Sequence, residues 1–163
     1  MTNSNLGIDL GAIRAAREVG RAVVEHTPVT PSAYLSSEFG GKIILKAENL
    51  QRTGAFKIRG AINKLHQLGE LAKNGVVAGS AGNHAQGLAF AAKHFGVKAE
   101  IFIPLGASLS KINACKGYGG IVLDGGESVD TAVLAAKERA LETGMAFCHP
   151  YDDVDVVAGQ GTL

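Results

Sequence analysis

The sequence is poor in cysteine and has no marked excess of charge of either sign. Its 163 residues include two cysteines, Cys115 and Cys148, which are not spaced as CxxC or CxxH. Neither a disulfide framework nor a zinc site is therefore expected. Lysine and arginine number 16 against 15 acidic residues, and this balance creates no broad field for nucleic acid or anionic lipid. We expect buried, reduced thiols, no metal site and no nucleic-acid partner.

The sequence also lacks long hydrophobic runs. No stretch approaches the roughly 18 apolar residues that a membrane helix requires. The N-terminal stretch MTNSNLGIDLG has neither the basic start nor the apolar core of a signal peptide. We therefore expect a cytoplasmic protein without a membrane partner. Glycine is abundant, with 22 residues, and it falls between periodic segments, as is typical of turns and close backbone approaches.

From residue 55 onward, short apolar strands alternate with amphipathic helices. The expected strands cover residues 76–79, 99–104, 120–123 and 145–149. The expected helices cover residues 55–68, 83–95, 108–116 and 127–143. This alternation predicts an α/β fold with a doubly wound parallel sheet, in which helices cover the strands and the connections are right-handed.

The two ends of the chain do not follow this alternation. Near the N-terminus we expect a helix over residues 9–25, with Asp9 as N-cap, and a strand over residues 42–46. The segment 149–153 is interpreted as a turn and a helix cap, and Asp152 or Asp153 begins a further helix. Because no strand closes this last stretch, we expect the chain to be cut from a longer one.

The loop GSAGNHAQG (79–87) is the main candidate site. In open α/β sheets, ligands bind beyond the carboxyl ends of strands, where the following helices begin. Gly79 and Gly82 permit tight turns, whereas Ser80 and Asn83 offer hydrogen bonds. The unpaired amides of the helix N-terminus suit a carboxylate or phosphate. The alternative is a plain strand-to-helix turn with Asn83 as N-cap, and the residues alone leave both open.

A second candidate is Lys57, at the start of the helix expected over 55–68. The positive end of the helix dipole lowers the pKa of a lysine there, and a neutral amine can form a Schiff base with a carbonyl. Phe56 beside it could pack against a flat cofactor. The alternative is a solvated surface lysine. Arg59 and Lys64 are interpreted as solvated or structural charges.

Two segments together point to a known family. TGAFKIRGA (53–61) and SAGNHAQG (80–87) closely resemble the signatures of the β-family, or fold-type II, pyridoxal-phosphate (PLP) enzymes. They are most similar to threonine dehydratase (threonine ammonia-lyase). The segments 46–65 and 149–162 also resemble that enzyme, and the resemblance runs from Thr27 to the last residue.

The resemblance implies a role for each matching residue. Lys57 would hold pyridoxal 5'-phosphate and later act as base at the substrate Cα. Phe56 would line one face of the cofactor ring, and Asn83 would bond its phenolic oxygen. The substrate carboxylate would be gripped by the loop made of Ser80, Ala81, Gly82, Asn83 and His84. The implied reaction converts an amino acid such as threonine or serine into a 2-oxo acid and ammonia.

One position bears on the choice among related reactions. Similar serine racemases carry a serine where this chain has Ala81, which has no proton to exchange, so dehydration is expected over racemisation. Sulfhydrylation or diaminopropionate elimination remains a further alternative within the β-family. A truncated paralogue that only binds a small carboxylate or a partner chain is an alternative outside catalysis.

The resemblance also implies a domain division. Residues 53–152 would form the small α/β domain, 1–52 the first part of a large domain, and 153–163 the start of the return to it. The glycine-rich loop for the PLP phosphate and the partner of the pyridine nitrogen would lie later in the chain. We therefore expect the 163 residues alone to bind PLP weakly, and we expect a homo-oligomer.

Overall fold

The computed structural model describes residues 7–163. Residues 1–6 lie outside the described residues. They include the start of the predicted segment 1–52 and the start of the N-terminal stretch that lacks the features of a signal peptide. None of the helices in the described part is both long and apolar enough to cross a membrane.

A parallel sheet forms the centre of the fold. Its strands, in the spatial order β5-β4-β3-β6, are β5 (Ile121–Asp124), β4 (Ala99–Ile103), β3 (Val76–Gly79) and β6 (Ala146–Phe147). Side chains alternate between the two faces, as the pleat requires. Val76 and Ala78 belong to one core cluster, whereas Val77 joins Ala136 and Met145 in a second. The strand β3 is buried on both faces.

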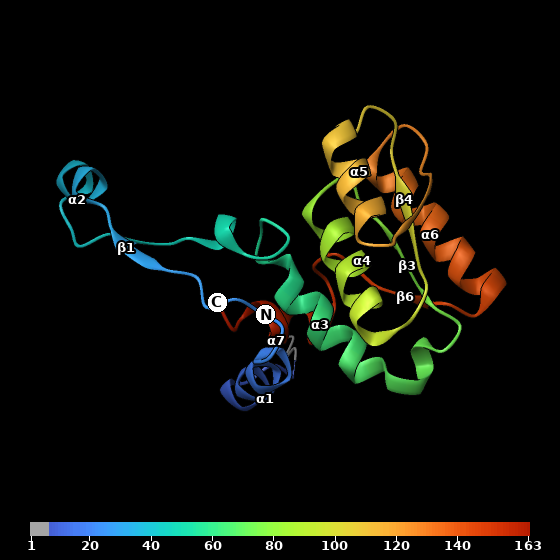
Figure 1. Cartoon of the computed structure of the whole chain (residues 1–163), viewed down its shortest axis with the longest axis horizontal. Coiled ribbons are helices and arrows are strands. Elements are labelled where there is room, and N and C mark those ends of the chain that lie inside the picture. Colours follow the sequence, from blue (N-terminus) through green and yellow to red (C-terminus); the bar gives the residue numbers. More distant parts are fainter. Residues whose placement is uncertain (1–6) are drawn as a thin grey trace, which may run out of the picture.

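Helices cover both faces of this sheet. Figure 1 shows α3 (Lys57–Leu68), α4 (Asn83–Phe95) and α5 (Leu109–Gly117) on one side and α6 (Val129–Thr143) on the other. Ala132 and Ala136 of α6 are fully buried, because this helix packs mainly on β3 and β4. The structure therefore confirms the predicted α/β fold with a parallel, doubly wound sheet.

The N-terminal part departs from the prediction. The helix α1 (Leu10–Gly20) is capped by Asp9 as expected, but it ends at Gly20 instead of residue 25. Glycine propagates a helix poorly, and the amides of Val23 and Val24 both turn back to the Gly20 carbonyl. The expected strand over 42–46 is shortened to β2 (Ile44–Lys46), which pairs antiparallel with β1 (Val29–Pro31).

Between these two strands lies α2 (Ala33–Phe39), a helix that we did not predict. Ser32 caps its start, and Gly40 ends it in the left-handed conformation at φ 66°. The serine before this helix and the glycine after it were the signals in the sequence that could have predicted it. None of the residues Ala33–Phe39 is buried, and the β1–α2–β2 arm projects away from the sheet and its helices (Figure 1).

The last helix, α7 (Val154–Gln160), returns to pack against α3 and α1. Asp153 is its N-cap and accepts hydrogen bonds from the Asp155 and Val156 amides. The contact with α3 is close: a Cβ added at Gly159 would lie 2.5 Å from the Arg59 carbonyl oxygen. Only glycine fits at this position, because any side chain would collide with the backbone of α3. The backbones of α7 and α3 are therefore in direct contact at the first turns of α3.

Candidate active site

Lys57 begins α3, and its amine is held by a distant part of the chain. The Nζ atom donates a 2.8 Å hydrogen bond to the carbonyl oxygen of Pro150, just beyond β6. Burial lowers the pKa of this amine below its ordinary value. The direction agrees with our prediction, but the cause is desolvation rather than the helix dipole from which we argued. Lys57 is therefore not a solvated surface lysine.

Phe56 directly precedes this lysine and occupies the N-cap position of α3. Its side chain is 36% exposed, and the Lys57 Nζ atom lies 5.3 Å from the centre of its ring. A part-exposed aromatic ring beside a half-buried amine offers an apolar face for a flat ligand.

The N-cap of α4 is not Asn83, the residue that the sequence offered for this role. Gly82, which has no side chain, is the N-cap, and Asn83 is the first helical residue and is exposed. The interpretation of Asn83 as N-cap is therefore wrong. Ser80 is buried, and its Oγ accepts a hydrogen bond from the Gly82 amide at 3.3 Å. Asn83 thus remains available for a ligand instead of being used as a cap.

His84 and Ala81 differ in their surroundings. Ala81 is half-buried, whereas His84 is only 3% exposed. The His84 Nε2 atom lies 3.2 Å from the carbonyl oxygen of Cys148, so the ring is joined to the protein backbone at β6. Burial lowers the pKa of His84 to about 4, and the ring is neutral at physiological pH.

The loop and Lys57 meet because α4 packs closely against the start of α3. A Cβ added at Gly87 would lie 3.1 Å from the Ile58 nitrogen and 3.2 Å from the Lys57 carbonyl carbon. In addition, Lys57 and His84 both reach the backbone of segment 148–150. The structure therefore brings the two predicted motifs together at the carboxyl edge of the sheet.

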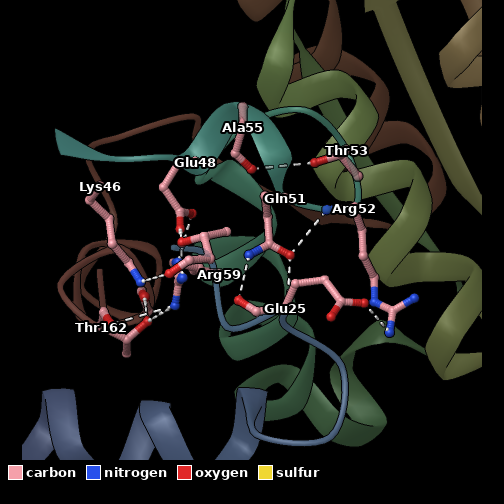
Figure 2. Close-up of polar contacts among 11 residues, drawn as sticks. Glu25, Lys46, Glu48, Gln51, Arg52, Thr53, Ala55, Arg59 and Thr162 are labelled. Carbon is pink, nitrogen blue, oxygen red and sulfur yellow. Dashed lines mark hydrogen bonds and ion pairs between the residues drawn. The ribbon is translucent and has the colours of Figure 1, made fainter. Parts of the chain in front are cut away.

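Arg59 and Lys64 have structural partners, as predicted. Figure 2 shows Arg59 of α3 facing Glu48, which lies in the 3-10 helix η1 (Glu48–Leu50). Two hydrogen bonds of 2.7 and 2.9 Å join the pair. Burial raises the pKa of Glu48, but hydrogen bonds from Arg59 and Thr27 outweigh it, so the pKa lies below its usual value. Lys64 pairs with Asp153 at 2.7 Å.

The sequence did not predict two features of this region. The first is the Pro150 carbonyl that holds Lys57; a contact between residues 93 positions apart leaves no local pattern. The second is Lys111 in the first turn of α5, whose Nζ lies 3.4 Å from where a Cβ at Gly82 would be. Its place after β4, at the same edge of the sheet, could have suggested it.

A cavity lies elsewhere in the fold, beside α1. It has a volume of about 580 Å³ and is lined by α1, the following turn and the last residues of the chain, with Arg17, Arg21 and Lys46 among its side chains. Neither Lys57 nor a residue of the loop 80–84 lines it. This cavity is therefore separate from the site around Lys57.

The chain is similar in sequence to known pyridoxal-phosphate-dependent enzymes. A family model described as pyridoxal-phosphate dependent enzyme matches residues 21–163. The chain is 48% identical over 157 residues to an L-threonine ammonia-lyase of Thermotoga maritima, covering 96% of the chain and 39% of that protein. It is 44% identical over 158 residues to a catabolic L-threonine dehydratase of Staphylococcus aureus (strain N315), covering 46% of it.

Solved structures agree with this assignment of fold. The structure of maize serine racemase superposes with a TM-score of 0.88 at 39% identity, covering 94% of this chain and 47% of that one. The processed form of threonine deaminase isoform 2 from Solanum lycopersicum gives 0.86 at 35% identity, covering 99% and 44%. The chain thus spans less than half the length of each of these four proteins.

Proposed function

Because the chain belongs to the pyridoxal-phosphate-dependent enzyme family, we propose that it contributes to the elimination of ammonia from L-threonine or L-serine, with Lys57 as the lysine that carries the cofactor. The observation that carries the proposal is the Lys57 amine: half-buried, with a lowered pKa, and held 2.8 Å from the Pro150 carbonyl. A fully solvated surface lysine has none of these three properties.

The residues around Lys57 suit pyridoxal phosphate. An amine that is less basic than a surface lysine is the group that reacts with an aldehyde. The ring of Phe56 provides an apolar face beside it, and the exposed Asn83 offers a hydrogen-bonding amide at the start of α4. In the proposal, Lys57 holds the cofactor covalently, Phe56 lines one face of its ring, and Asn83 bonds its phenolic oxygen. Bound there, pyridoxal phosphate would supply an electron sink for negative charge at the substrate Cα.

In the proposed reaction Lys57 also moves a proton. The Nζ atom becomes a free amine when the amino group of the substrate replaces it on the cofactor. It can then accept the proton that leaves the substrate Cα, and the lowered pKa of the amine keeps a larger neutral fraction available near pH 7. The β-hydroxyl takes up a proton and leaves as water, and hydrolysis of the product by water yields a 2-oxo acid and ammonia. Lys57 is the catalytic residue of this proposal.

The loop 80–84 would bind the substrate carboxylate. Its amides at the start of α4 carry the positive end of the helix dipole, and the Lys111 ammonium lies over Gly82. Ser80, Ala81, Gly82 and Asn83 form this binding loop, and His84 anchors it from below through the Cys148 carbonyl. We also propose the domain division 1–52, 53–152 and 153–163, in which the site lies on the middle unit.

Racemisation is the second candidate, since maize serine racemase has 39% identity to this chain. Ala81 disfavours it: a methyl group cannot return a proton to the opposite face of the substrate. Incubation with pyridoxal phosphate and L-serine, followed by chiral separation, distinguishes the two. Pyruvate without D-serine supports elimination, and rapid formation of D-serine would overturn it.

The test of cofactor binding is a titration with pyridoxal phosphate. Since the 163 residues alone should bind the cofactor weakly, we expect a weak visible absorbance band in the wild-type protein, which Lys57→Ala abolishes. The matched control, Lys73→Ala, removes an exposed lysine just after the 3-10 helix η2 (Gly69–Ala72) and should leave the band unchanged. A band that survives in Lys57→Ala would refute the role of Lys57.

A further inference from the structure

His84, the second residue of α4, is buried, and its hydrogen bond to the backbone just after β6 fixes its tautomer. The Nε2 atom lies 3.2 Å from the Cys148 carbonyl oxygen, which can only accept. The proton must therefore sit on Nε2. The Nδ1 atom then has a bare lone pair, and among residues 7–163 it has no hydrogen-bond partner.

The acceptor of this bond belongs to a short backbone segment at the end of β6. The amide of Cys148 donates to the Val77 carbonyl at 2.9 Å, and its carbonyl accepts from His84, so the peptide groups on both sides of this residue are held. Pro150, two residues further along the chain, has no amide hydrogen, so its own peptide nitrogen cannot donate a hydrogen bond that would hold it in place. The position of its carbonyl therefore depends on Cys148 before it and on the turn after it, where His149 Nδ1 accepts from the Asp152 amide at 2.8 Å.

The Pro150 carbonyl is in turn the acceptor for Lys57. The 2.8 Å bond from Nζ holds the amine in place. His84 and Lys57 thus anchor on carbonyl groups two residues apart, one from α4 and one from α3. A shift of the segment 148–150 would move the acceptor of the Lys57 amine.

We infer that His84 is a positioning residue, whose Nε2–H holds the Cys148 carbonyl and thereby sets the place of the Lys57 amine through Pro150. This inference deepens the proposed function and rests on it for its catalytic meaning. The family resemblance places His84 among the residues of the loop that grips the substrate carboxylate, whereas this inference gives its side chain a different task. The ring nitrogen that could donate to a carboxylate, Nε2, is already used by the backbone.

A pair of amide substitutions separates the two roles. In His84→Gln the Nε2 of glutamine lies the same number of bonds from the backbone as the histidine Nε2, so the donor to Cys148 is kept. In His84→Asn the amide nitrogen ends at the position of Nδ1, and the donor is lost. Both variants are polar and uncharged, so they differ mainly in where the donor lies.

The readout is the pH profile of Lys57 acetylation, measured without cofactor by competitive labelling and mass spectrometry. In His84→Asn we expect the apparent pKa of Lys57 to rise by at least about half a unit, because the freed amine turns to water. In His84→Gln we expect the wild-type profile. Equal profiles in the two variants, whether altered or not, would overturn the inference.

Two further measurements keep the test decisive. Pyridoxal-phosphate loading should weaken about tenfold in His84→Asn and recover in His84→Gln, as expected when a reactive group is displaced. If wild-type Lys57 takes no cofactor, the proposed function fails while the labelling profile still decides the role of His84. Should His84→Asn not fold, ¹⁵N spectra of the wild-type imidazole give the answer: the Nε2–H tautomer supports the inference, and the Nδ1–H tautomer contradicts it.

Discussion

The Nζ atom of Lys57 donates a 2.8 Å hydrogen bond to the carbonyl oxygen of Pro150, and this bond joins the start of α3 to the end of β6. It places a half-buried amine at the carboxyl edge of the sheet, where α4 also begins. Parallel strands put all their carboxyl ends at one edge, so residues from separate βα units meet there.

The close packing of α4 on α3 predicts that Gly87→Ala destabilises the protein. The new Cβ would lie 3.1 Å from the Ile58 nitrogen and 3.2 Å from the Lys57 carbonyl carbon, so one helix must shift. We expect a loss of roughly 1–3 kcal/mol in the free energy of unfolding. Gly117→Ala, in an exposed helical position with no atom within 4 Å, is the control and should be neutral or stabilising. Equal losses would contradict this account of the packing.

The buried pair of Glu48 and Arg59 predicts a large effect for Glu48→Gln. The side chains are only 10% and 8% exposed, and the substitution leaves the guanidinium without its counter-charge. We expect a loss of roughly 3 kcal/mol or more by chemical denaturation. Glu18→Gln breaks a pair with Arg21 that is 67% and 79% exposed, and it should cost below about 1 kcal/mol. A small effect at Glu48 would mean that water reaches the pair.

His84 predicts a pH dependence of stability. Its pKa falls from 6.5 to about 4 on folding, so between these values the unfolded chain binds a proton that the folded chain does not. Stability is therefore full above pH 6.5 and declines as the pH falls toward 4, by up to roughly 3 kcal/mol. Hydrogen bonds from Arg139 lower the pKa of Glu100 to about 2, so that carboxylate weakens stability only below pH 4.5.

The control for this dependence is His84→Gln, which cannot titrate. Denaturation midpoints measured between pH 7 and 4.5 should fall in the wild type and stay nearly level in the variant. The same slope in both proteins would assign the effect to another group.

The two thiols should resist alkylation while the protein is folded. Cys115 and Cys148 are free and fully buried, and burial raises the pKa values of these thiols to about 11 and about 12. At pH 8 we expect iodoacetamide to react about a hundred times more slowly than with the unfolded chain. Rapid labelling of native protein would show that these positions open readily.

Much of the sheet and its helices could be predicted from local sequence. The strand over 76–79 and the helix over 83–95 have the predicted bounds. The strand is a continuous apolar run that ends at Gly79, and the helix has an amphipathic period and stops before Gly96. The helix α2 was missed, since its side chains stay exposed and show no buried stripe. Local signals thus predicted the sheet and the helices that cover it, and they missed α2 and β1 in the exposed arm.

The candidate site was predicted less completely. Lys57 and the loop 80–84 were identified from their motifs, but the burial and tautomer of His84 depend on Cys148, which lies 64 residues away. The Pro150 carbonyl is a backbone group, and any residue type could supply it. Such features arise from tertiary packing, so they become visible only when the segments are placed side by side.

The measurement that tests the central claim most directly is to locate bound cofactor. The protein is incubated with pyridoxal phosphate, reduced with borohydride and digested, and the modified peptides are identified by mass spectrometry. The account predicts that the pyridoxyl group is found on Lys57 ahead of every other lysine, Lys111 included. Modification spread evenly over the surface lysines, with Lys57 unmarked, would contradict it.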